Sequence, residues 1–159
     1  MSGRVVVIGV GNPLRGDDGA GPAAVRALRG RVPDGTVLAV SDGEPARMLG
    51  LWRGADTVVV VEALRASPAR PGRLHTLTAA DASNRAAGTA STHALGLGAC
   101  LALAEALGRL PRRLVVHAVE VTSTELGTGL SEAVRSVLPE LTARAAASVQ
   151  QAYESERSH

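Results

Sequence analysis

The chain has 159 residues, of which 45% are hydrophobic and 20% charged, and its formal net charge is +2. These values are typical of one soluble domain, residues 1–159, that needs neither disulfides nor a metal to build its core. It contains no Phe, one Trp and one Tyr. The core is therefore predicted to be aliphatic, and single-stranded nucleic-acid binding, which stacks bases on aromatic rings, is not expected.

The only cysteine, Cys100, lies between apolar neighbours. It cannot form an internal disulfide or supply a multi-cysteine metal site, so a small buried hydrophobic side chain is the interpretation we favour. The run at residues 4–10 is too short for a signal peptide, and no apolar stretch reaches membrane-spanning length. We therefore expect a cytoplasmic protein without membrane contact.

Predicted strands and helices alternate along the chain. The strands are expected at residues 4–10, 36–41, 57–62, 73–78 and 114–120, and the helices at residues 20–30, 44–52, 93–108 and from about 131 toward 153. A break or restart of the last helix is expected at Pro139, a polar loop over residues 79–92, and fraying over residues 154–159. This order predicts a three-layer α/β/α sandwich, with a mixed, mostly parallel sheet of about five strands.

The loop after the first predicted strand needs to be distinguished from a nucleotide-binding loop. Gly9-Val10-Gly11 begins like a dinucleotide fingerprint, but Leu14 stands where the third glycine is required. Asp17 and Asp18 would also repel a pyrophosphate. The charge therefore argues against a phosphate-binding role.

In open α/β sheets, ligands gather beyond the carboxyl ends of the strands. Three candidates are predicted there: Asp18 in the first loop, Glu62 at the end of the valine strand, and His93 at the start of an apolar helix. Each alone has a structural explanation, as a helix cap, a solvated strand end or a helix-end histidine. Together, two carboxylates and an imidazole would form a three-ligand site for a divalent metal with positions open for water or substrate.

With these segments in view, the chain resembles the hydrogenase maturation proteases, the endopeptidases that trim the C-terminus of nickel–iron hydrogenase large subunits. The resemblance rests on motifs that follow the family's order and spacing along nearly the whole chain. They are VVVIGVGNPLRGDDGAG (5–21), VVVVEAL (58–64), STHALGLGACLALA (91–104), HAVEV (117–121) and GLSEAV (129–134).

The resemblance implies a mixed sheet between helices and a metal-contacting trio at Asp18, Glu62 and His93. In the family this trio recognises nickel already inserted in the precursor, so the metal is part of the substrate rather than a resident cofactor. Asp17 is implied as a neighbour that tunes or caps. The family usually has aspartate at the position of Glu62, and its Asp-Gly-Gly-Thr segment is replaced here from Asp42 onward by Asp-Gly-Glu-Pro. Asp42 is kept as a further candidate.

The predicted reaction is hydrolysis of one peptide bond near the C-terminus of the nickel-loaded precursor. No Ser–His–Asp or Cys–His set is persuasively placed, so the base is predicted to be a carboxylate or the water to be held by the metal. Two alternatives remain open at this point. One is a non-proteolytic metal-binding or chaperone-like protein that binds the precursor without cutting it, and the other is a small-molecule enzyme using the same loops.

Overall fold

The computed structural model describes residues 3–82, 97–122 and 129–157. Its centre is a five-stranded sheet with the spatial order β2-β1-β3-β5-β4. The strands are β1 (Val5–Val10), β2 (Val37–Ser41), β3 (Thr57–Arg65), β4 (Leu74–Thr78) and β5 (Arg113–Val121). Neighbouring strands are parallel except for β4, which runs antiparallel to β5 at one edge. The predicted mixed, mostly parallel sheet is confirmed.

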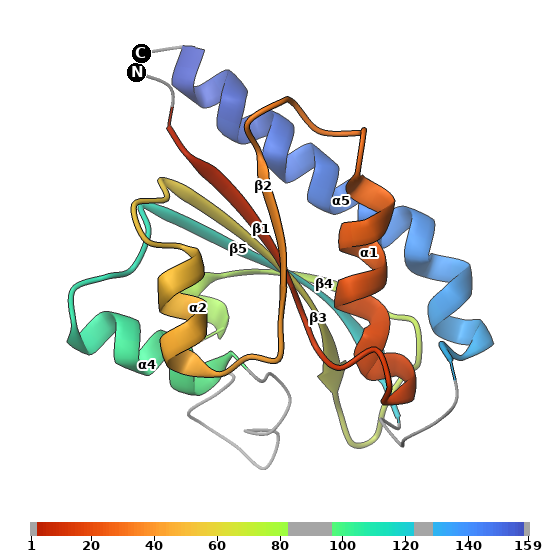
Figure 1. Cartoon of the computed structure of the whole chain (residues 1–159). Coiled ribbons are helices and arrows are strands. Elements are labelled where there is room, and N and C mark those ends of the chain that lie inside the picture. Colours follow the sequence, from red (N-terminus) through yellow and green to blue (C-terminus); the bar gives the residue numbers. More distant parts are fainter. Residues whose placement is uncertain (1–2, 83–96, 123–128, 158–159) are drawn as a thin grey trace.

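Helices cover both faces of this sheet (Figure 1). They are α1 (Ala20–Leu28), α2 (Pro45–Leu51), α4 (Gly98–Ala106) and α5 (Glu132–Arg157), and a short 3₁₀ turn, η1 (Gly16–Gly19), precedes α1. The pair α1 and α5 packs on one face, and the pair α2 and α4 on the other. This is the three-layer sandwich that the sequence predicted. No helix in the described part of the chain has the length and apolar character needed to cross a membrane.

The valine run of β3 divides its side chains between the two layers of core. Val58 and Val60 pack toward α2 and α4, whereas Val59 and Val61 pack toward α1 and α5. This alternation follows from the two-residue period of a strand and explains why an unbroken apolar run is needed in a sheet covered on both sides. The core is aliphatic as predicted, with Trp52 as the one aromatic side chain in its α2/α4 half.

Helix α1 approaches the sheet without side chains between the two backbones. A Cβ atom on Gly21 would lie 2.3 Å from the carbonyl oxygen of Val61, and one on Gly9 would lie 2.4 Å from the carbonyl oxygen of Gly21. Only glycine fits at either position. Gly9, the first glycine of the partial nucleotide fingerprint, thus serves together with Gly21 to pack α1 against β1 and β3.

Several predicted boundaries were wrong, including the start of the polar loop, because residues 79–82 are helical. Strand β3 continues past Glu62 to Arg65, because Ala63 and Leu64 are buried and remain paired with β5. Pro139 lies inside α5 without ending it. The lost backbone donor and the steric conflict of a helical proline are offset there by a buried stripe along the helix. That stripe consists of Val134, Leu141, Ala145, Val149 and Ala152.

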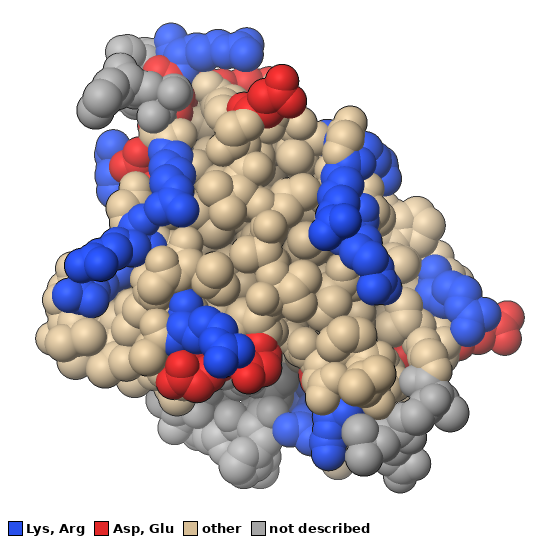
Figure 2. All heavy atoms as spheres, viewed as in Figure 1, with Lys and Arg blue, Asp and Glu red and all other residues tan. Residues whose placement is uncertain are grey.

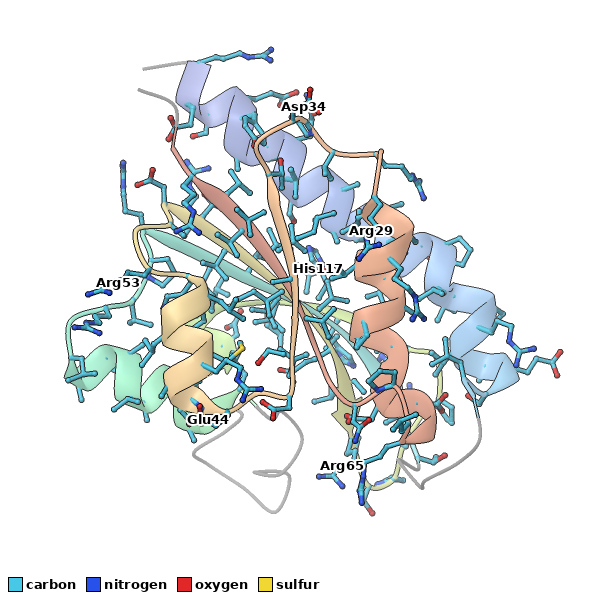
Figure 3. The ribbon with its side chains drawn as sticks, viewed as in Figure 1. Arg29, Asp34, Glu44, Arg53, Arg65 and His117 are labelled. Carbon is cyan, nitrogen blue, oxygen red and sulfur yellow. The ribbon has the colours of Figure 1, made fainter. Side chains whose placement is uncertain are left out.

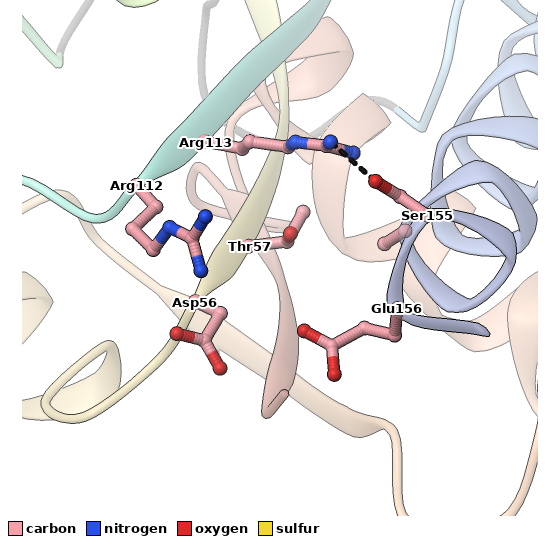
Figure 4. Close-up of a pocket in the computed structure, with 7 residues that line it drawn as sticks. Asp56, Thr57, Arg112, Arg113, Ser155 and Glu156 are labelled. Carbon is pink, nitrogen blue, oxygen red and sulfur yellow. Dashed lines mark hydrogen bonds between the residues drawn. The ribbon is translucent and has the colours of Figure 1, made fainter. Parts of the chain in front are cut away.

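Residues 154–157 were predicted to fray, but α5 runs to Arg157. Near its end, the Ser155 hydroxyl accepts a hydrogen bond from Arg113 (Figure 4). The Glu156 carboxylate accepts one from the backbone N–H of Gly3. These contacts hold the last turn of α5 to the amino ends of the strands. A cavity of about 370 Å³ lies here, at the opposite end of the sheet from the predicted site.

Two glycines that lie in helices test how closely α1 packs against the sheet. Ala has the higher helix propensity by up to about 1 kcal/mol, and a Cβ atom on Gly50 of α2 meets nothing within 4 Å, so Gly50→Ala is expected to stabilise the protein. Gly21→Ala is expected to destabilise it by about 1–3 kcal/mol because the new methyl group meets Val61. Urea unfolding of both variants measures the two signs, and a stable Gly21→Ala protein contradicts the proposed packing.

Candidate active site

The last residues of β1 and β2 are in register with the middle of β3. Val10, the last residue of β1, pairs with Ser41 on one side and Glu62 on the other, and Glu62 pairs with Ala118 of β5. Strands β1 and β2 stop at this level, whereas β3 and β5 continue. Glu62 is therefore a mid-strand residue that borders the open end of β1, and not a strand-end residue as predicted.

Asp18 lies over the same end of β1. Its Oδ2 accepts a hydrogen bond of 2.7 Å from the backbone N–H of Asn12, and the Asn12 side chain in turn accepts one from Leu14. The turn is tight: Gly11 has φ 142°, and a Cβ atom there would lie 1.9 Å from the carbonyl oxygen of Asp18. The side chain of Asp18 is half-buried, so its carboxylate remains within reach of a ligand. Asp18 and Glu62 thus come from different elements to the end of one strand.

Asp17 has a different partner from its neighbour. Its carboxylate accepts hydrogen bonds from the backbone N–H of Ser131 at 2.6 Å and from the Ser131 hydroxyl at 2.8 Å. Ser131 directly precedes α5, and its hydroxyl also accepts the N–H of Val134. The capping role predicted for one aspartate is thus directed to α5, and neither η1 nor α1 has a side-chain cap. Asp17 ties the first loop to the last helix.

Glu62 is only 2% exposed and points into the α2/α4 side of the sheet, since it alternates with Val60 and Leu64 of that core. Cys100 of α4 is buried on the same side. Burial, followed by the negative charges of Glu44 and Glu62, raises the pKa of the Cys100 thiol to about 12. A thiol that stays protonated is a poor nucleophile, which agrees with the predicted structural role of Cys100.

His93 lies outside the described residues, so the structure does not test whether it joins the two acids. The chain enters α4 through Leu97, which is buried on the face that carries Glu62. Within residues 3–82, 97–122 and 129–157, no three His, Cys, Asp or Glu side chains are grouped to hold a metal ion. A three-ligand metal site that includes Asp18 and Glu62 would therefore need a ligand from outside these described residues.

Asp42, the further candidate, follows β2 at the same edge of the sheet. Its Oδ2 lies 3.5 Å from the Arg47 guanidinium, and Oδ1 accepts the N–H of Glu44. Glu44 in turn caps α2 by accepting the N–H groups of Ala46 and Arg47. Glu44 and Pro45, the residues that depart from the family pattern, thus form the N-cap and first residue of α2, a local role typical of these residue types.

Sequence reasoning missed a hydrogen-bonded pair, His75 and Glu120, on the face of the sheet that carries Glu62. His75 pairs with Ala118, the residue that also pairs with Glu62, and its Nε2 lies 2.7 Å from Glu120 Oε2. The backbone N–H of Arg70 donates to the other Glu120 oxygen. Burial alone would raise the pKa of Glu120, but the hydrogen bonds from His75 and Arg70 and the nearby positive charges lower it. The sequence signal that could have revealed this pair is Glu120, an acid in the mostly apolar predicted strand 114–120.

A second missed histidine lies inside β5. His117 is buried, its Nε2 lies 2.7 Å from the Ser148 hydroxyl of α5, and its Nδ1 lies 3.1 Å from Thr76 of β4. Burial, followed by the charge of Arg144, lowers its pKa to about 4. Both ring nitrogens are engaged on the α5 side of the sheet, whereas Glu62 faces α2 and α4. His117 is therefore a structural group.

The chain is similar to known proteins over most of its length. The family model described as hydrogenase maturation protease matches residues 25–148. The hydrogenase 2 maturation protease of Escherichia coli K12 is 30% identical over 139 residues, which cover 85% of this chain and 84% of that protein. The hydrogenase expression/formation protein HupD of Bradyrhizobium diazoefficiens is 32% identical over 117 residues, 71% of this chain and 60% of that protein.

Solved structures agree on the fold. The hydrogenase maturating endopeptidase HybD from E. coli superposes with a TM-score of 0.80 at 24% identity, covering 93% of each chain. The HybD protease from Thermococcus kodakarensis superposes with a TM-score of 0.66 at 23% identity, covering 89% of this chain and 96% of that one. The chain thus shares the fold of these solved structures over nearly its whole length.

The fold and the matched residues define a peptidase, a hydrolase of peptide bonds. The chain belongs to the hydrogenase maturation protease family. The resemblance drawn from the sequence motifs is confirmed. Because the matched family and the relative are described as proteases, they favour a peptidase over the non-proteolytic and small-molecule alternatives.

The buried His117 makes the stability of the fold depend on pH. An unfolded histidine titrates near pH 6.5, whereas the folded-state pKa is about 4. Protonation therefore favours the unfolded chain: this contribution is unchanged above about pH 6.5, decreases as the pH falls from there to 4, and is constant below. The expected loss is on the order of 3 kcal/mol.

Urea unfolding of the wild-type protein and of His117→Gln between pH 4 and 8 measures this loss. The variant is expected to be less stable at pH 7 but flatter over pH 6.5 to 4. Cys100→Ala, which removes another buried side chain whose thiol stays protonated over this range, is the control and should keep the wild-type slope. Equal slopes in the wild-type and His117→Gln proteins would contradict the assignment.

Proposed function

We propose that the protein is an endopeptidase that removes a C-terminal peptide from the nickel-loaded precursor of a nickel–iron hydrogenase large subunit. Asp18, Glu62 and His93 recognise the inserted metal in this proposal, so the nickel is substrate cargo and not a resident cofactor. Family membership supports the reaction class. One observation carries the residue assignment: Asp18 and Glu62 come from separate elements to the carboxyl end of β1.

The donor chemistry fits a divalent metal carried by the substrate. Two carboxylates and an imidazole are suitable ligands for nickel, although the same donors also accept zinc or copper. A cation beside the buried Glu62 interacts strongly with it, because the local dielectric is low. A precursor without its metal would bring no such cation, so discrimination between loaded and empty precursors follows from charge alone.

The proposed hydrolysis uses water as the nucleophile. The water oxygen attacks the scissile carbonyl carbon and its proton passes to a carboxylate, after which the C–N bond breaks and the departing amine takes up the proton. Of the two acids, the half-buried Asp18 is the better placed for the role of base because solvent reaches it. The protonated thiol of Cys100 is not available as an alternative nucleophile.

The cytoplasm remains the proposed compartment. The chain has a single, buried cysteine, so its fold needs no internal disulfide from an oxidising compartment. The proposed partner is the hydrogenase large-subunit precursor, and neither a nucleic acid nor a membrane forms part of the proposal.

The assignment of the trio is tested by trimming of a nickel-loaded precursor, followed by mass spectrometry. His93→Ala, Asp18→Asn and Glu62→Gln are each expected to reduce the rate at least about 100-fold, because each removes a group proposed to contact the metal or the reacting water. Circular dichroism and thermal unfolding check that each variant is folded. Wild-type trimming rates in folded His93→Ala would remove this residue from the mechanism.

Two matched variants separate site chemistry from packing. Glu62→Asp keeps the carboxylate and restores the residue usual in the family, so it should retain activity within about tenfold, whereas Glu62→Gln of the same size should not. Cys100→Ala changes a buried side chain that lies close enough to Glu62 to be affected by its charge, leaves all three proposed residues in place, and should trim normally. Loss of activity in Cys100→Ala with a stable fold would reopen the question of the nucleophile.

A further inference from the structure

Strand β2 is an edge of the sheet that approaches the candidate site. In the described part of the chain it pairs with β1 alone. The carbonyl oxygen of Ser41 accepts the N–H of Gly11 and so points toward β1. Because the backbone groups of successive strand residues alternate in direction, the N–H and C=O groups of Leu38 and Val40 point away from β1. Such outward groups can accept another strand.

The side chains of β2 do not protect this edge. The strand reads VLAVS, with no charge and no proline, and Val40 is 48% exposed. Natural edge strands are usually blocked by a charged residue, a proline or a bulge. The absence of a charge or proline here is unusual for a surface that has no partner.

Positive charges stand on both sides of the strand. Figure 2 shows an uncharged strip between two groups of arginine side chains, and Figure 3 places Arg53, which follows α2, and Arg29, which follows α1, on opposite sides of β2. Among the described residues, Arg26, Arg29 and Arg53 form no ion pair. The edge is thus bordered by cations whose charges are available to a partner.

From these observations we infer that β2 binds an extended segment of the substrate polypeptide as a sixth strand, with acidic side chains directed to the flanking arginines. This deepens the proposed function and rests on it. The five residues of β2 span about 17 Å and end at Ser41, level with Val10 and Glu62. A segment paired along β2 therefore leads into the place where hydrolysis is proposed.

A peptide strand is the occupant that the edge fits best. The outward groups of Leu38 and Val40 are main-chain donors and acceptors spaced for another main chain, which side-chain ligands or small molecules do not match. The substrate of a peptidase supplies such a main chain. A second copy of this chain paired through the same edge would place arginines against arginines, since both sides of β2 carry them, and this repulsion disfavours it.

Val40→Pro tests the inference because it removes an outward N–H while leaving the hydrogen bonds to β1 in place. The control is Val40→Thr, which keeps the N–H and the branched shape. We expect Val40→Pro to raise the KM for the nickel-loaded precursor about tenfold with kcat nearly unchanged, and Val40→Thr to stay within twofold of wild type. Equal KM values for two folded variants overturn the inference.

A second pair of variants applies if Val40→Pro lowers the melting temperature strongly. Arg29→Glu combined with Arg53→Glu should raise KM about tenfold at low salt. Arg112→Glu combined with Arg157→Glu makes the same charge change away from β2, directly before β5 and at the end of α5, and should leave KM within twofold of wild type. An equal rise in KM for both pairs would show that the interaction depends only on net charge, and would overturn the inference that β2 is a specific binding edge.

Hydrogen exchange separates failure of this inference from failure of the proposed function. A synthetic peptide covering the C-terminal cleavage region of the precursor is expected to protect the amides of Leu38 and Val40. Absence of that protection while the wild-type protein trims the precursor rejects the edge and leaves the protease assignment intact. Protection without any trimming supports the edge and rejects the proposed reaction.

Discussion

The direct contact of α1 with the sheet backbone is the constraint on which the geometry of the candidate site depends. With glycine at positions 9 and 21, the helix lies against the carbonyl groups of β1 and β3 and not on a layer of side chains. The loop between Val10 and Ala20 must therefore close over the end of β1 within a few residues. Gly11, at φ 142°, allows this turn, and Asp18 is held there as a consequence.

The two adjacent aspartates divide two tasks. Asp17 is buried, and its carboxylate accepts hydrogen bonds from the N–H and hydroxyl of Ser131, so it fixes the start of α5 relative to the first loop. Asp18 keeps a carboxylate that is only half-buried. The rigidity supplied by the first aspartate benefits the second, because a ligand-binding group loses less entropy when its loop is already ordered.

The local pattern of the chain predicted most of the fold. Continuous β-branched runs, glycine and proline boundaries, and the alternation of strands with helices led to five strands and their helical layers, because these are properties of short segments. Glu62 shows the limit of such reasoning: a charged residue after four valines was taken for a strand end, whereas pairing with β5 carries the strand on through Leu64. Local polarity does not reveal a partner strand.

Partners distant in sequence could not be predicted for the site either. Asp17 and Ser131 are 114 positions apart, and the Asp17 carboxylate was expected to act on the nearest helix. The His75–Glu120 and His117–Ser148 pairs likewise depend on the antiparallel pairing of β4 and on where α5 crosses the sheet. Those arrangements are decided by packing of the whole domain. The assignment of His93 rests on the sequence resemblance.

The proposed metal contact and the proposed strand contact act on one substrate, and their combination has a physical consequence. The strand contact is modest alone, since one edge of five residues contributes only a few exchanged hydrogen bonds. Joined in one precursor, binding of either part raises the effective concentration of the other. Hydrolysis severs this connection when the bond lies between them, so each product retains a single contact and dissociates faster than the substrate. Recognition in two parts would therefore provide selectivity for the loaded precursor together with release after one cut.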